Sequence, residues 1–259
     1  MNRYHLTFGC DGSTLAGTLD TAPGTSGLLI VTGGNEVRAG AFSGQAALAR
    51  SIAQAGFPVF RFDRRGVGDS EGENRGFRAS LKDILAAIEA FRAMLPAMNR
   101  MIAFGNCDAA SALMLMKGDL CDGLVLSNPW TIEQDDGALP ADVIRSRYAS
   151  KLKDPRELVR LVTGKVDLGK LARGIVRSVS PAPKVTTLAQ DMAAGLDAST
   201  KPYRFLLAQN DRTAQVFRES FPLDPDADVR VCENASHAYV EPHARDWLKA
   251  ELLAALRGK

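Results

Sequence analysis

Short apolar runs alternate with segments of helical periodicity along this chain, and that alternation limits the fold more than any other feature of the sequence. A strand that is apolar along its whole length has to be buried on both faces, as in a parallel sheet covered by helices. The intervening amphipathic segments would supply those covering helices. The strands that we expect are Leu28–Val31, Pro58–Phe62, Met101–Phe104, Leu124–Leu126, Tyr203–Leu207 and Val229–Cys232.

The remaining elements complete the predicted sheet. Arg3–Phe8 and Leu15–Leu19 flank Asp11-Gly12, a dipeptide typical of hairpin turns, and predict an antiparallel start. An opening hairpin followed by strand–helix alternation predicts an α/β fold with a mostly parallel central sheet and helices on both faces. The helices that we expect are Ser43–Ala55, Leu81–Leu95, Asp108–Met116, Thr213–Ser220 and Arg245–Leu256.

Residues 131–200 interrupt this alternation. They carry helical patterns but no convincing strand, and the segment is too long for a loop inside a compact domain. We therefore expect a helical cap or lid at 131–200, with the α/β core formed by 1–130 and 201–259. Between residues 143 and 180 the segment has ten Lys or Arg against three Asp or Glu. A solvated helical face explains such a charge run, and so does attraction of an anionic or carrier-linked substrate.

Charge and composition exclude several classes of protein. The 259 residues carry a formal net charge of +2, which gives no overall attraction for nucleic acid. No uncharged apolar run approaches the roughly 18 residues that a transmembrane segment needs. The four cysteines are dispersed without a CxxC pair, and the chain opens without the apolar region of a signal peptide. These features predict reduced thiols, no metal site and a cytoplasmic location.

One buried strand passes through a tight turn directly into a helix, at the sequence Gly-Asn-Cys-Asp-Ala of residues 105–109. A sharp strand-to-helix turn requires small residues two positions before and after its apex, where this chain has Gly105 and Ala109. The arrangement is that of a nucleophile elbow with Cys107 at the apex. The helix dipole would favour a thiolate there, and the N–H of Asp108 would face a developing oxyanion. A buried structural cysteine is the competing interpretation.

Two further residues complete a catalytic order. Asp211 follows the expected strand Tyr203–Leu207, and His237 follows the next expected strand. Nucleophile, acid and histidine then come in the chain order of α/β-hydrolases, and both later residues follow strand ends, where open parallel sheets place their sites. His5 and His243 lie out of register. Taken singly, Asp211 would fit a helix N-cap and His237 a surface histidine.

These residue types suit acyl chemistry. Asp211 would orient His237, which would take the proton of Cys107 and later activate water, and Cys107 would form a thioester. The second oxyanion donor is expected from the loop after the first buried strand, as the N–H of Gly34 or Asn35. Thiolates attack esters and thioesters more readily than unactivated amides, which favours an esterase or thioesterase over a peptidase. The carboxylate next to the cysteine in the chain opposes the thiolate, and the sequence leaves that balance open.

A loop dense in charge and glycine follows the second buried strand. We expect Asp63 and Arg64 to form internal ion pairs that support the site, and Gly66 and Gly68 to adopt positive φ. The Gly66-x-Gly68 pair belongs to neither GxGxxG nor a Walker sequence with its lysine. The sequence therefore predicts no cofactor.

Together these motifs resemble the α/β-hydrolase superfamily. Residues 62–70, Phe-Asp-Arg-Arg-Gly-Val-Gly-Asp-Ser, are similar to its Asp-x-Arg-Gly-x-Gly-x-Ser stretch. More narrowly, the chain resembles the type 1 hydrolase associated with the exosortase A system of Gram-negative bacteria. The segments that carry this resemblance are Gly33–Gly40, Arg61–Ser70, Gly105–Ala112 and Asn128–Trp130.

The resemblance implies a cytoplasmic enzyme encoded near exopolysaccharide and protein-sorting functions, acting on a small-molecule acyl substrate that it does not identify. Three alternatives stay open: a dienelactone-hydrolase-like enzyme, an acyltransferase, and a non-catalytic binding protein that keeps the hydrolase fold. Dienelactone hydrolases have a Gly-x-Cys-x-Gly elbow, from which Ala109 departs. Haloalkane dehalogenases and epoxide hydrolases need an aspartate at the apex, where this chain has Cys107.

Overall fold

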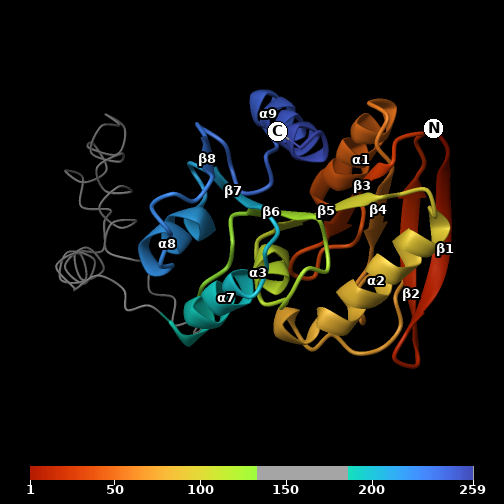
Figure 1. Ribbon diagram of the computed structural model, residues 1–259, viewed down its shortest axis with the longest axis horizontal. Helices are drawn as coiled ribbons and strands as arrows, with labels where there is room; N and C mark the ends of the chain where they lie inside the picture. Colours follow the sequence, from red (N-terminus) through yellow and green to blue (C-terminus); the bar gives the residue numbers. More distant parts are fainter. Residues whose placement is uncertain (133–185, 259) are drawn as a thin grey trace, which may run out of the picture.

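The computed structural model describes residues 1–132 and 186–258. One eight-stranded sheet runs through it, in the order β1-β2-β4-β3-β5-β6-β7-β8 (Figure 1). β1 pairs with β2 and β2 with β4 in antiparallel fashion, while every other neighbouring pair is parallel. The strands are β1 Arg3–Cys10, β2 Ser13–Asp20, β3 Ser26–Val31, β4 Val59–Phe62, β5 Arg100–Asn106, β6 Gly123–Ser127, β7 Tyr203–Ala208 and β8 Val229–Cys232. The predicted, mostly parallel sheet is therefore confirmed.

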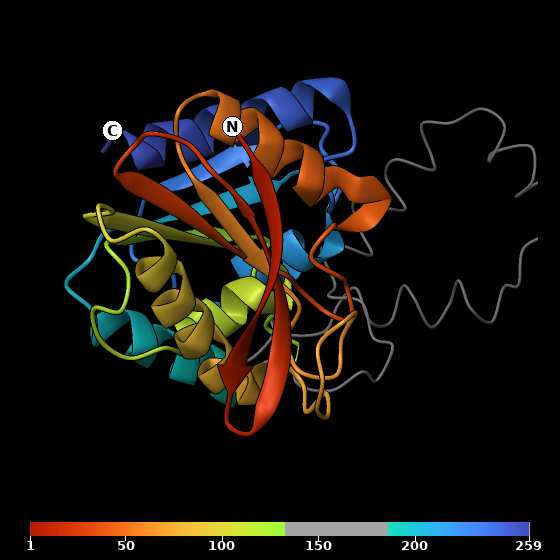
Figure 2. The same cartoon turned by 90° about the vertical axis from the view of Figure 1, so that its right-hand side faces the viewer.

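The opening hairpin is also confirmed, with its turn at the predicted dipeptide. Asp11 and Gly12 join β1 to β2 with φ of 50° and 80°. Positive φ at both central residues matches the backbone twist of the flanking strands, which is why Asp-Gly is favoured there. Figure 2 shows this hairpin at the edge of the sheet.

Helices cover both faces of the sheet. α1 and α9 run side by side over one face (Figure 2), and α2, α3, α7 and α8 lie against the other (Figure 1). Each helix that the sequence predicted is present within a few residues of its expected ends. The helices are α1 Gly44–Gln54, α2 Leu81–Met94, α3 Asp108–Met114, α7 Thr187–Asp197, α8 Arg212–Ser220 and α9 Pro242–Leu256, with short 3-10 turns at η1 Ala41–Ser43 and η2 Phe77–Ala79.

Alternate side chains of each central strand serve two separate cores. In β3, Leu28 and Ile30 pack in the cluster formed with α1 and α9, whereas Leu29 and Val31 pack in the cluster on the opposite face. All four are fully buried. A strand buried on both faces gains nothing from polar alternation, which accounts for the continuous apolar runs of the sequence.

The C-terminal part of the predicted cap belongs to the core. Helix α7 falls within 131–200, yet Leu188 and Met192 are buried in the main hydrophobic cluster and the helix packs on α3. Gly195 allows this close approach, because a Cβ there would lie 2.0 Å from the carbonyl oxygen of Met114. The core therefore resumes at α7, before the predicted boundary at 200. Residues 133–185, the rest of the predicted cap with its basic segment, lie outside the described residues.

Candidate active site

Cys107 occupies a strained turn between β5 and α3. Its φ of 62° and ψ of −128° are unusual for a residue with a side chain. The turn is tight because a Cβ at Gly105 would lie 2.7 Å from the backbone carbonyl carbon of Ala109, and Ala109 itself is fully buried. The predicted need for small residues on either side of the apex is thus explained by direct backbone contact.

Asp211 and His237 meet beyond the ends of β7 and β8. His237 Nδ1 lies 2.9 Å from Asp211 Oδ2. The same carboxylate accepts hydrogen bonds from the N–H groups of Thr213 (3.2 Å) and Ala214 (3.1 Å) at the start of α8. Both interpretations of Asp211 from the sequence therefore apply, because it caps the helix and holds the histidine ring.

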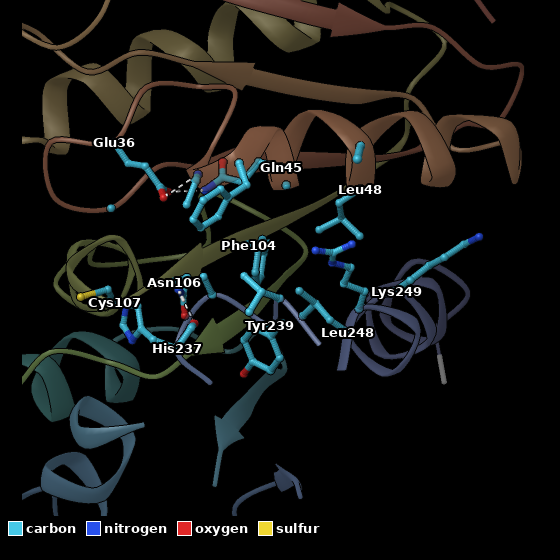
Figure 3. Close-up of a pocket in the computed structure, with 18 of the residues that line it drawn as sticks. Glu36, Gln45, Leu48, Phe104, Asn106, Cys107, His237, Tyr239, Leu248 and Lys249 are labelled. Carbon is cyan, nitrogen blue, oxygen red and sulfur yellow. Dashed lines mark hydrogen bonds between the residues drawn. The ribbon is translucent and has the colours of Figure 1, made fainter. Parts of the chain in front are cut away.

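His237 also contacts Cys107. The hydrogen bond to Asp211 and then the hydrogen bond to Cys107 raise the pKa of His237 from its ordinary 6.5 to about 10, against an opposing effect of burial. The ring therefore favours its imidazolium form at neutral pH. Figure 3 shows Cys107 and His237 next to each other at one end of a cavity. The three residues that the sequence selected from separate strand ends lie together.

The Asp108 carboxylate turns away from the sulfur and towards the loop after β3. It accepts a hydrogen bond from the N–H of Gly34 at 2.6 Å and forms an ion pair with Arg64 at 3.3 Å. Arg64 is almost fully buried and also donates to Ser80 Oγ (3.1 Å). Its guanidinium offsets the negative charge that the sequence places beside Cys107, which addresses the balance left open above.

This contact changes the choice of oxyanion donors. The N–H of Gly34 is engaged by Asp108, so it does not face the space beside the sulfur as the sequence suggested. The N–H of Asp108 stands at the first position of α3, where no intrahelical carbonyl can accept it. Asn35 borders the cavity next to Gly34. The arrangement favours Asp108 and Asn35 over Gly34 as donors.

Buried charges hold the loop after β3 in place. Asp63, which is fully buried, pairs with Arg38, and Arg38 also pairs with Asp69 at 2.9 Å. Gly66 and Gly68 have φ of 69° and 57°, as predicted. At Gly68 a Cβ would lie 2.3 Å from Asp63 Oδ2, so glycine is required for the carboxylate to fit. The predicted internal ion pairs of Asp63 and Arg64 are both present.

Asn128 links three strand ends, a role that its place in the sequence did not indicate. Its side chain is fully buried and accepts a hydrogen bond from the N–H of Ala208 at 2.8 Å. Its Nδ2 donates to Asn106 Oδ1 (2.9 Å) and to the carbonyl oxygen of His237 (3.3 Å), and Asn106 Nδ2 donates to the same carbonyl (3.2 Å). The signals in the sequence were an asparagine directly after a buried strand and its place in the segment Asn128–Trp130, which carries the family resemblance.

A cavity of about 530 Å³ extends from the sulfur between α1 and α9. Cys107 and His237 border one end, and Lys249 lies towards the other (Figure 3). Its middle is largely apolar, with Ala47, Leu48, Phe104, Tyr239 and Leu248 among the lining residues. Such a cavity has the size and lining of a small-molecule site. The sequence patterns of α1 and α9 did not predict this cavity.

Two classes of feature are absent from the described part of the chain. No group of three or more His, Cys, Asp or Glu side chains is arranged to hold a metal ion there. Across 1–132 and 186–258, no helix combines the length and apolarity needed to cross a bilayer.

The family described as serine aminopeptidase, S33, matches residues 27–173, more than half of the 259-residue chain. The chain belongs to this family of α/β-hydrolases. Its description names serine enzymes, whereas this S33-family member has a cysteine at the turn between β5 and α3. None of the curated protein sequences matches the chain significantly.

Solved α/β-hydrolases are similar to this S33-family protein over almost its whole length. The esterase Pf2001 of Pyrococcus furiosus covers 99% of this chain and 90% of its own, with a TM-score of 0.63 and 14% identity. Est1E of Butyrivibrio proteoclasticus, solved with ferulic acid, covers 98% and 100%, with a TM-score of 0.59 and 16% identity. XC6422 of Xanthomonas campestris is described as a serine hydrolase without lid. It covers 99% of this chain and 94% of its own, with a TM-score of 0.56 and 15% identity. At such identities the likeness establishes the fold.

Proposed function

We propose that this S33-family protein is a cysteine-dependent acyl hydrolase that cleaves an ester or a thioester. Cys107 is the nucleophile, His237 the general base and acid, and Asp211 the residue that orients His237. The observation that carries the proposal is the connected series from Asp211 through His237 to Cys107 on a strained turn at the end of a cavity. An idle binding protein has no chemical need for all three residues in contact.

The reaction follows from the hydrogen bonds. Because Nδ1 of His237 faces Asp211, Nε2 is the atom that exchanges protons with Cys107 and substrate. The sulfur, as thiolate, attacks the acyl carbon, and the carbonyl π electrons move onto oxygen. When the intermediate collapses, the alcohol or thiol leaves with the proton from Nε2, and a thioester to Cys107 remains.

Hydrolysis reverses the proton movements. Nε2 of His237 takes a proton from water, and the resulting hydroxide attacks the thioester carbon. Collapse expels the thiolate of Cys107 and releases the acid, while His237 keeps its proton for the next cycle. The N–H groups of Asp108 and Asn35 are the proposed donors to the oxyanion in both steps.

Substrate class follows from the nucleophile. A thiolate expels alkoxide or thiolate leaving groups from esters and thioesters, whereas amide cleavage demands far more help from the acid. The solved structures similar to this chain include esterases, which agrees with this choice. The exopolysaccharide and exosortase context and the cytoplasmic location stay predictions from the resemblance.

Intact-mass spectrometry with short-chain 4-nitrophenyl esters and acyl-CoA thioesters tests the proposal. We expect a mass increase equal to the acyl group, carried by Cys107, and steady release of nitrophenolate. Cys107→Ala should lose both, with turnover reduced about a thousandfold or more. Full turnover by Cys107→Ala would refute the assignment.

Alkylation by iodoacetamide adds an internal control. Cys121 is buried, and burial raises the pKa of its thiol to about 12, so it should resist labelling. Cys107, which is half-buried beside an imidazolium, should react first at neutral pH. Equal rates at the two cysteines, together with no acylation by any ester, would favour the non-catalytic binding protein. Transfer of the acyl group to added alcohols in preference to water would identify an acyltransferase.

A further inference from the structure

Two cations on helix α9 border the cavity, and Lys249 lies towards the end away from the sulfur (Figure 3). Arg245 and Lys249 both line the cavity and stand four positions apart on α9. Residues at that spacing lie on the same face of a helix, so the two side chains border the same space. Arg245 is exposed, Lys249 is partly exposed, and Leu248 beside it is buried.

Neither cation has an anionic partner among the described residues. No carboxylate in 1–132 or 186–258 lies within ion-pair distance of Arg245 or Lys249. The buried arginines Arg61 and Arg64, by contrast, each pair with an aspartate. Two unpaired cations at the wall of a largely apolar cavity create a place where an anion is favoured.

Two carboxylates also line the cavity, and one of them stands away from α9. Glu36 is held by the N–H of Ala41 (2.8 Å) and by Gln45 Nε2 (3.0 Å), at the beginning of α1. Asp246 is the other carboxylate on the lining and stands next to Arg245. The end of the cavity formed by α9 therefore carries two positive groups against one negative group.

We propose that the substrate of this protein has an apolar acyl chain whose far end carries an anionic group, a carboxylate being the simplest. The inference rests on the proposed acyl hydrolysis. The acyl carbon lies at Cys107, the chain passes Phe104 and Leu48, and the anion is bound by Arg245 and Lys249. The cavity thus selects half-esters or half-thioesters of dicarboxylic acids over simple fatty acyl esters.

A matched pair of substrates tests this specificity. 4-Nitrophenyl hydrogen adipate and 4-nitrophenyl methyl adipate have the same acyl chain and leaving group and differ only in the terminal charge. We expect kcat/KM to be about tenfold higher for the charged ester, because a charge-assisted contact is made in its complex alone. The same pairs built on succinate and suberate establish which chain length reaches the cations.

Variants of α9 assign the preference to its residues. The ratio of kcat/KM for the charged ester to that for the neutral ester should fall towards one in the double variant Arg245→Gln, Lys249→Gln. It should rise in Asp246→Asn, which removes the opposing charge from the same lining. A ratio near one in the wild-type protein at all three chain lengths would overturn the inference, as would a ratio that the double variant leaves unchanged.

Binding to an inactive variant separates this inference from the proposed function. Calorimetry with Cys107→Ala compares monomethyl adipate with dimethyl adipate, with no turnover required. Tighter binding of the monoester that depends on Arg245 and Lys249 supports the anion site even if no ester is hydrolysed. Hydrolysis through Cys107 without any preference for charge would leave the proposed function standing and refute the anion site.

Discussion

The two ends of the cavity differ in how their polar groups are satisfied. At the reactive end Asp108 is paired with Arg64, and His237 is held by Asp211. At the other end Arg245 and Lys249 have no ion-pair partner in the described part of the chain. Groups that are already paired keep a fixed geometry, which chemistry requires, whereas unpaired charges leave room for a ligand to supply the partner. We therefore expect the paired groups to position the reaction and the unpaired cations to recognise the substrate.

Asp211→Asn should have the largest effect on the reactive end. Asparagine still caps α8 but presents the wrong group to Nδ1 of His237, so kcat should fall by about 10³ to 10⁴, with a smaller loss of stability than in a variant that also removes the cap. Asp211→Ala should lose similar activity and, in addition, about 1 kcal/mol of unfolding free energy with the cap. Ester kinetics and urea denaturation measure the two quantities. Equal stability losses in both variants would contradict the dual role of Asp211.

Gly105→Ala tests the tight turn below the sulfur. The added methyl group would lie 2.7 Å from the backbone of Ala109, so the turn must open. We expect a loss of about 2 to 3 kcal/mol in unfolding free energy together with most of the activity. Gly9→Ala is the control, because a Cβ there has nothing within 4 Å. Equal stability of Gly105→Ala and Gly9→Ala would contradict the close backbone contact at the turn.

Asn128→Asp tests whether Asn128 positions His237 for the reaction or shapes the cavity that binds substrate. The carboxylate keeps its shape but cannot donate to Asn106 or to the carbonyl of His237. We expect kcat to fall about tenfold or more with KM nearly unchanged, because the imidazole is misplaced and the cavity is not. A rise in KM alone would argue that Asn128 shapes the cavity instead. Titration of His237 by NMR provides a second readout that a merely structural role would leave unmoved.

The protonation state of His237 gives the most direct test of its contacts with Asp211 and Cys107. Its pKa is raised from 6.5 to about 10 by Asp211 first and Cys107 second, so its NMR titration should lie well above neutrality and move down in Asp211→Asn. A raised pKa contributes stability that is complete below pH 6.5 and is lost as pH rises through about 10. The wild-type protein should therefore lose more unfolding free energy over this range than His237→Gln. An equal loss of unfolding free energy in the wild type and in His237→Gln would show that the protonation of His237 does not stabilise the fold.

Much of the fold and the order of the site residues could be predicted because each depends on local chemistry. Continuous apolar runs such as Leu28–Val31 indicate strands buried on both faces, and Gly105 with Ala109 indicates a turn that tolerates no larger side chains. Asp211 and His237 follow strand ends, and parallel strands bring those ends to one edge.

Other features depend on contacts between segments that are distant in sequence. Asp108 faces Gly34 and Arg64 only after three strands have assembled, and Asn128 has its role only when β5, β6 and β7 lie in register. Helix α7 carries the same amphipathic pattern as any cap helix, so its periodicity alone could not assign it to the core. The cavity between α1 and α9 is likewise a product of packing, not of either helix alone.

The backbone conformation of Cys107 has a consequence for the stability of the folded protein. A side chain at φ of 62° and ψ of −128° is held there against its own preference, and glycine would adopt the same angles at less cost. The inert variant Cys107→Gly should therefore be at least as stable to unfolding as the wild type. The fold alone would be served at least as well by glycine, so the thiol is held at this position at a cost in stability.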